Sequence, residues 1–353
     1  MDGTAATRYP LRTIPGYLAS KPGIQIGTYL SPSASDEDLQ FLQQLGVEWV
    51  MLIVEGGPEK QTAEAYARHR DRLAQWGLQI YRIGNHNVHN MEQVTLNLPG
   101  RDQKIEEFLT FIRNLGKAGI HYNTYGHMAN GIWSSGQATM RGGVVARTMD
   151  LRDAKGNWNG VLYEGALTHG REYSEEELWE NYAYFIKQVA PVAEEAGVYI
   201  GMHPDDPPVY TLGGVPRPIL GNMKGFKRAL EIANSPYIGV CLCVGCWLEG
   251  GAEGMGADVI EAIRTFGAMG KLFKVHFRNV SNPLPAPWAE TFIDNGYMDM
   301  HRVMQALREV RFDGCAIPDH IPGMIGGHRV GEAYSVAYMR ALIQAVNNEF
   351  GGA

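Results

Sequence analysis

Four side chains that can bind a transition metal occur at equivalent places in the second half of the chain. His203, Cys243, His276 and Asp319 each close a short apolar stretch, at intervals of 40, 33 and 43 residues. Imidazole, thiolate and carboxylate groups together bind divalent ions such as Mn²⁺, Fe²⁺, Co²⁺ or Zn²⁺. The pattern therefore predicts one metal site built from these four residues, with Cys241 on the same strand face as Cys243 but one layer deeper, as a packing residue.

The intervals match strand–helix units, whose parallel strands would present their last residues on one rim of a barrel. We expect eight strands, at residues 24–30, 47–54, 78–83, 120–125, 197–202, 238–243, 272–277 and 314–319. Helical patterns lie between them, and Ser174 with Glu177 has the spacing of a capping box. The sequence predicts a single (β/α)8 TIM barrel over residues 1–353. A doubly wound fold is the alternative, but the glycines of "RGGVVAR" lack the spacing of a dinucleotide fingerprint.

Two segments exceed what a barrel needs. Residues 1–22 form an N-terminal extension. Residues 133–173, rich in glycine and polar side chains, are too long for an ordinary connection. Because this insert follows the fourth strand, we expect it near the barrel mouth, as a lid or a subunit contact.

Composition excludes several classes of partner. The formal net charge of -7 gives no reason to expect nucleic acid or an anionic membrane surface. No apolar run reaches the roughly 20 residues of a membrane span, and the first residues lack a signal core, so we expect a cytoplasmic protein. The four cysteines do not have the spacing of a disulfide framework. A barrel of this size is compatible with homo-oligomers.

The segment "GMHPDDPPVY", residues 201–210, combines a metal-type histidine with two acids and three prolines. The prolines stiffen the backbone just beyond the fifth strand, so that His203 points inward. Asp205 and Asp206 are then placed to hold the ligands or the substrate. The alternative is that the two aspartates merely favour a turn.

The chain resembles the D-mannonate dehydratase family, metal-dependent enzymes related to the xylose-isomerase-like barrels. The motifs are "PVAEEAGVYIGMHPDDPP", "GVPRPI", "CVGCWLEGG", "KVHFRNV" and "AIPDH", and the similarity runs from about residue 88 to residue 345. It implies that the four donors are metal ligands, with Mn²⁺ the leading ion, and that His320 does acid–base work. Met324 and Ile293 depart from the family pattern, so substrate-side positions differ.

The resemblance implies a hydro-lyase reaction on a small sugar acid such as D-mannonate. A proton leaves the carbon next to the carboxylate and the 3-hydroxyl departs, giving a 2-keto-3-deoxy acid. Candidate partners for His320 in proton transfer are Tyr334, His328 and Asp206. Candidate substrate-binding residues are Arg217, Arg278 and Arg147 for the carboxylate, His89 and Asn123 for hydroxyl groups, and Asp205.

Two other functions are compatible with the same barrel. A metal-dependent sugar or sugar-acid isomerase or epimerase would share the proton abstraction but release no hydroxide. A non-catalytic sugar-binding barrel would be expected to lack one of the ligands or His320, and all five residues are present.

Overall fold

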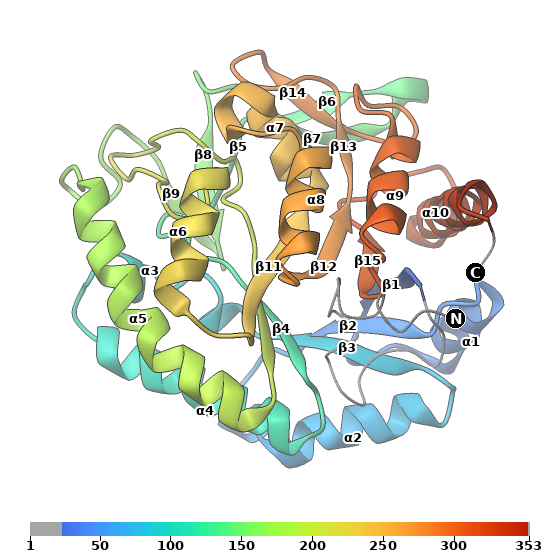
Figure 1. The fold of residues 1–353 in the computed structure, drawn as a ribbon, viewed down its shortest axis with the longest axis horizontal. Coiled ribbons are helices and arrows are strands. Elements are labelled where there is room, and N and C mark those ends of the chain that lie inside the picture. Colours follow the sequence, from blue (N-terminus) through green and yellow to red (C-terminus); the bar gives the residue numbers. More distant parts are fainter. Residues whose placement is uncertain (1–22, 352–353) are drawn as a thin grey trace.

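Eight parallel strands form a nearly closed barrel at the centre of the molecule (Figure 1). The computed structural model describes residues 23–351, so the expected extension over residues 1–22 lies outside the described residues. The strands are β1 (Gln25–Leu30), β2 (Trp49–Ile53), β3 (Gln79–Gly84), β4 (Tyr122–Tyr125), β10 (Tyr199–Met202), β11 (Ile238–Cys243), β12 (Leu272–Phe277) and β15 (Cys315–Pro318). Their hydrogen-bonded order is β3-β2-β1-β15-β12-β11-β10-β4, and every neighbouring pair is parallel. The predicted (β/α)8 barrel is confirmed.

Helices cover the outside of the barrel (Figure 1). They are α1 (Asp36–Gln44), α2 (Ala63–Ala74), α3 (Glu92–Thr95), α4 (Arg101–Lys117), α5 (Glu175–Ala196), α6 (Met223–Ala233), α7 (Val244–Met255), α8 (Val259–Ala268), α9 (Met300–Glu309) and α10 (His328–Glu349). The predicted capping box is confirmed, because the Ser174 hydroxyl accepts from the Glu177 amide and the Glu177 carboxylate accepts from the Ser174 amide. Gly197 ends α5 with φ of 64°, a left-handed conformation that suits glycine. Among residues 23–351, no helix combines the length and apolar character needed to cross a bilayer.

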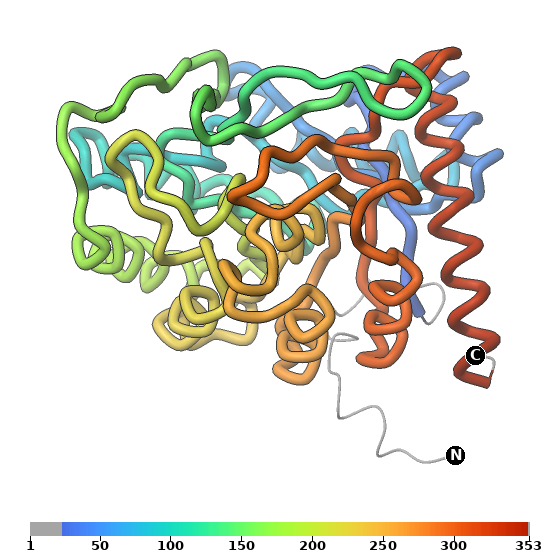
Figure 2. The backbone as a smooth tube through the Cα atoms, turned by 90° about the horizontal axis from the view of Figure 1, so that it is seen from above, coloured from blue at the N-terminus to red at the C-terminus, as the bar shows by residue number. Residues whose placement is uncertain are grey.

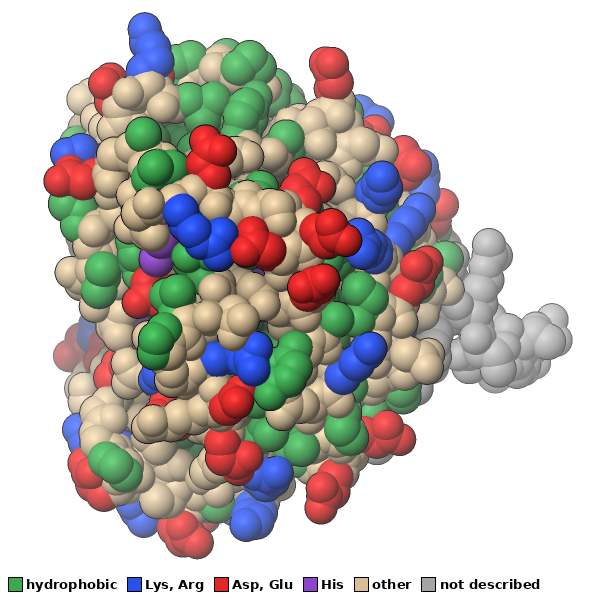
Figure 3. Space-filling model, turned by 90° about the vertical axis from the view of Figure 1, so that its left-hand side faces the viewer, with side chains coloured by type: hydrophobic (Ala, Val, Ile, Leu, Met, Phe, Trp, Pro, Cys, Tyr) green, Lys and Arg blue, Asp and Glu red, His purple; other side chains and the backbone are tan. Residues whose placement is uncertain are grey.

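The strands are buried on both faces because side chains fill the barrel on one side and helices cover the other. All six residues of β11 and all six of β12 are buried. Their register pairs Cys243 with His276, so the last residue of β11 lies beside the ligand-type histidine of β12. On the outer surface drawn in Figure 3, acidic and basic side chains are interspersed.

The segment expected as an insert contains five short strands. β5 (Ile132–Ser134), β8 (Lys155–Trp158) and β9 (Val161–Tyr163) form one antiparallel sheet. β6 (Gly136–Thr139) and β7 (Val145–Met149) join β14 (Trp288–Thr291) and β13 (Asn279–Val280) in another. Figure 2 shows the two chain segments, green and orange, on the same side of the barrel. Because β7 pairs with β14, the segment after β4 is bound to the segment after β12.

Candidate metal centre and active site

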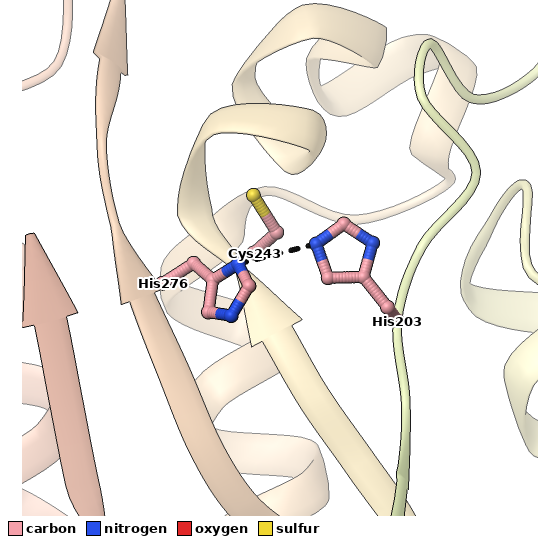
Figure 4. Close-up of side chains that lie close together, drawn as sticks. All are labelled: His203, Cys243 and His276. Carbon is pink, nitrogen blue, oxygen red and sulfur yellow. Dashed lines mark hydrogen bonds between the residues drawn. The ribbon is translucent and has the colours of Figure 1, made fainter. Parts of the chain in front are cut away.

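Three of the predicted donors meet at the carboxyl ends of neighbouring strands (Figure 4). His203 follows β10, Cys243 closes β11 and His276 lies in β12. Their ligand atoms all lie within 4.8 Å of one another, and His203 Nε2 is 3.3 Å from His276 Nδ1. The arrangement places two nitrogens and one sulfur close enough to bind the same ion.

The fourth predicted donor, Asp319, lies one residue beyond β15. Its Oδ2 is 3.4 Å from His276 Nδ1 and 4.0 Å from Cys243 Sγ. The carboxylate therefore completes a set of two nitrogens, one sulfur and one oxygen around the mouth of the barrel.

Local contacts prepare these groups to bind a cation. His203 donates its backbone N–H to Tyr125 O, and its Nδ1 lies 2.7 Å from Pro204 O, which leaves the Nε2 lone pair facing the cluster. Burial by itself would raise the pKa of Cys243, but the Cys246 donor and the Arg278 charge hold it well below its usual value. A thiolate, a carboxylate and two imidazole nitrogens fit a divalent transition metal ion.

A cavity of about 200 Å³ is lined by three of these donors, His203, His276 and Asp319. Its lining residues are Tyr29, Ile53, Arg82, His86, His89, Thr124, Met128, Ile132, Trp158, His203, Asp206, His276, Asp319 and His320. Five barrel strands (β1, β2, β3, β4 and β12) contribute lining residues, and the segment after β4 adds others, among them Trp158 on β8. Of the residues predicted for substrate or proton transfer, the structure brings His320, Asp206 and His89 to the cavity.

His320 is held by a carboxylate that the sequence did not identify. Its φ is 47°, an uncommon left-handed conformation for a non-glycine residue. Its Nδ1 is 2.5 Å from Glu290 Oε1, and its Nε2 is 3.9 Å from Asp319 Oδ2. Although burial would lower the pKa of His320, Asp319 and Glu290 raise it to about 9. The imidazole is thus fixed at one nitrogen and directs the other toward the candidate ligands.

Behind the donors lies a buried network of arginines and carboxylates. Arg147 Nη1 is 2.9 Å from Asp206 Oδ1, and its Nε is 2.8 Å from Glu290 Oε1. Arg278 Nη1 is 2.6 Å from Glu249 Oε1. Burial would raise the pKa of Asp206, but Arg147 and Arg278 keep it below its usual value. Burial and then the charge of Asp206 raise the pKa of Glu249 to about 8.

The three arginines expected to hold the substrate carboxylate all donate to acceptors of the protein. The donors of Arg147 and Arg278 face carboxylates of the protein, and Arg278 also donates to the Cys243 and Cys246 sulfurs at 3.5 and 3.4 Å. Arg217 donates to Pro207 O, Asn130 Oδ1 and Gly131 O. None of the three lines the mouth cavity. Protein groups therefore accept hydrogen bonds from all three arginines.

Four other expected site residues lie away from the cavity. Asp205 lines a separate internal void together with Arg217, and burial raises the pKa of Asp205 to about 6. Asn123 is buried on β4. Tyr334 lies on α10 and its hydroxyl accepts from Arg141 at 3.5 Å. His328 lines a different cavity beside β1. The fold places these four residues away from the cavity, which their spacing in the sequence could not indicate.

Sequence reasoning missed three residues of the site. Arg82 is a charged residue inside an apolar strand, a signal that marks an inward-facing polar side chain. Trp158 and Glu290 gave no such signal, because they arrive on β8 and β14, short strands outside the barrel repeat. Periodicity identifies the staves of a barrel but not the strands that cover its mouth.

The sequence of this chain is similar to those of known mannonate dehydratases. The family model of D-mannonate dehydratase (UxuA) matches residues 33–155 and 162–351. Mannonate dehydratase of Thermotoga neapolitana is 32% identical over 312 residues, covering 79% of this chain and 82% of its own length. Mannonate dehydratase 2 of Halalkalibacterium halodurans is 29% identical over 292 residues, covering 77% and 82%.

Solved structures give the same picture. The crystal structure of mannonate dehydratase from Streptococcus suis serotype 2 superposes with a TM-score of 0.81 and 25% identity, over 94% of this chain and 96% of that one. A xylose isomerase domain protein from Planctomyces limnophilus superposes with a TM-score of 0.61 and 14% identity, over 93% and 99%. The second likeness concerns the fold alone.

Proposed function

The chain belongs to the D-mannonate dehydratase family, and from this membership we propose that it removes water from D-mannonate to give a 2-keto-3-deoxy acid. The observation that carries the proposal is the meeting of four ligand-type side chains beneath a cavity of about 200 Å³. The family consists of hydro-lyases, and the cavity offers the charged and proton-bearing groups that such an elimination needs.

We propose His203, Cys243, His276 and Asp319 as the residues that hold a divalent metal, with Mn²⁺ as the leading ion. Such an ion would supply positive charge where negative charge develops on the carboxylate of the substrate. The thiolate, held by Arg278, gives the donor set its sulfur. The ion would face the cavity because three of the donors, His203, His276 and Asp319, line it.

We propose His320 as the proton donor to the departing hydroxyl. Its raised pKa keeps the imidazole protonated at neutral pH, and Glu290 holds Nδ1 so that Nε2 carries the proton to be transferred. Asp206 lines the same cavity as an ionised carboxylate. It is our candidate for the group that accepts the carbon-bound proton.

Two further side chains orient the sugar in this proposal. Burial, and then the charge of Arg82, lower the pKa of His89 well below its usual value, so the imidazole is neutral. Its Nδ1 lies 3.0 Å from Thr124 O, which leaves Nε2 free to accept from a substrate hydroxyl. Trp158, from the segment after β4, lines the cavity and would limit access of water in this proposal.

The test is incubation of the purified protein with D-mannonate and added Mn²⁺. Formation of a 2-keto-3-deoxy acid, which is lighter than the substrate by one water, supports the proposal. A product of unchanged mass would indicate isomerisation or epimerisation instead. Activity that persists after chelation and removal of bound metal would contradict the metal role.

A further inference from the structure

One buried arginine of the cavity, Arg82, has a side-chain nitrogen without a hydrogen-bond partner among residues 23–351. Arg82 lies on β3, is only 4% exposed and lines the cavity above the four donors. Within residues 23–351 its Nε has no hydrogen-bond partner, and its side chain forms no ion pair with a carboxylate. A guanidinium group carries a full charge and five donors, so burying it without an acceptor is costly.

The strand is built to accommodate this side chain. Gly84 lies two residues beyond Arg82, on the same face of β3 and nearer the barrel mouth. A Cβ atom at Gly84 would lie 2.7 Å from Arg82 Nη2 and 2.8 Å from Ile53 Cδ1. The missing side chain leaves the space through which the guanidinium extends toward the cavity.

The other buried arginines near the candidate ligands have carboxyl partners in the protein. Arg147 and Arg278 are surrounded by the carboxyl groups of Asp206, Glu249 and Glu290. In the described part of the chain no carboxylate pairs with Arg82, so an anionic ligand in the cavity would supply the missing acceptor. A planar carboxylate accepts two parallel hydrogen bonds from a guanidinium group.

We propose that Arg82 binds the carboxylate of the substrate and selects sugar acids over neutral sugars. This inference rests on the proposed function, because it names the residue that anchors the acid group in that reaction. It assigns to Arg82 the role that the sequence suggested for Arg217, Arg278 and Arg147. Arg82 alone of these four arginines lines the cavity.

Lys274 is a second buried cation with an unpartnered side-chain nitrogen, and it serves as a matched control. It lies on β12, is fully buried, and its Nζ has no hydrogen-bond partner within the described chain. It precedes His276 by two residues, which places it one layer deeper, and it does not line the cavity. It shares the burial and the charge of Arg82 but not its access to a ligand.

The experiment compares Arg82→Met with the wild type in the metal-loaded enzyme. Binding of D-mannonate and of its uncharged amide is measured by calorimetry. Loss of a charged hydrogen-bonding pair should reduce the preference for the acid about 10- to 100-fold. The amide should bind both proteins within about threefold. Lys274→Met should keep the wild-type preference.

Two further readouts separate a binding role from a structural one. The unfolding temperature of Arg82→Met without ligand should equal or exceed that of the wild type, because no pair is broken; a marked decrease would overturn the inference. Gly84→Ala keeps the charge but displaces the guanidinium, and it should weaken binding of the acid more than of the amide. Equal weakening of both ligands would also overturn it.

The outcome for Arg82 can be distinguished from that for the overall function. If the wild type binds D-mannonate through Arg82 but forms no dehydrated product, the proposed reaction is wrong and the carboxylate site stands. If the wild type dehydrates D-mannonate and Arg82→Met retains both kcat/KM and acid preference, the reaction stands and the carboxylate site is wrong.

Discussion

Replacement of Arg278 by methionine tests the charge balance behind the metal site. The arginine is 1% exposed, and the substitution removes its charge while keeping a long side chain. Arg278 lies within 3.4 Å of carboxylate oxygens of Glu249, Glu290 and Asp319, and it donates to Cys243 Sγ at 3.5 Å. We expect a large loss of stability in the metal-free protein.

The size of the stability loss depends on which acidic groups still have an arginine partner after Arg278 is replaced. Glu249 and Glu290 retain Arg147, at 3.4 and 2.8 Å, so they are only partly affected. Asp319 and the Cys243 thiolate have no contact with Arg147. Removing one partner of a buried pair costs about 3–5 kcal/mol, and we expect the lower end, about 3 kcal/mol, because part of the network survives.

The assay is urea unfolding at pH 7, with chelator and then with saturating Mn²⁺. The ion would neutralise Asp319 and Cys243, and removal of a neighbouring positive charge should favour its binding. The destabilisation should therefore shrink when metal is present. Arg217→Met is the control, since its hydrogen bonds go to Pro207, Asn130 and Gly131 oxygens and its loss should cost about 1–3 kcal/mol with little dependence on metal.

A loss below about 1 kcal/mol for Arg278→Met in chelator would refute the argument, since it would mean that the buried acids do not depend on this charge. An equal loss with and without Mn²⁺ would refute the placement of the metal beside Arg278.

The remaining predictions concern the ligands and the proton-transfer groups. Cys243→Ser should abolish tight metal binding in a metal titration, whereas Cys241→Ser should cost about 1–3 kcal/mol of stability and keep the metal; equal effects would contradict the strand phasing. His320→Asn should bind metal normally but lose turnover, and Glu290→Gln should lower kcat about 10- to 100-fold with unchanged metal content. Because the folded pKa of Glu249 is raised to about 8, this carboxyl contributes stability below its unfolded pKa that is lost as pH rises through about 8. Glu249→Gln should therefore flatten the decrease in unfolding free energy between about pH 4.5 and 8, and an unchanged slope would exclude this source.

The sequence by itself determined the barrel and the convergence of the four donors. A parallel strand buried on both faces has a distinct apolar pattern, and each strand–helix unit has a nearly constant length. Ligand-type residues at the ends of successive strands, such as Cys243 and His276, must then lie side by side, and the register confirms that pairing.

Tertiary structure alone decided which charged residues line the cavity. An arginine has the same local signal whether its partner is a protein carboxylate or a ligand, so Arg147 and Arg278 could not be told from Arg82 until Glu249 and Glu290 were placed. Glu290 reaches the site on β14. This strand pairs with β7, which lies about 140 residues earlier in the chain. Long-range pairing of this kind leaves no local periodicity, and the free or occupied state of a buried charge depends on it.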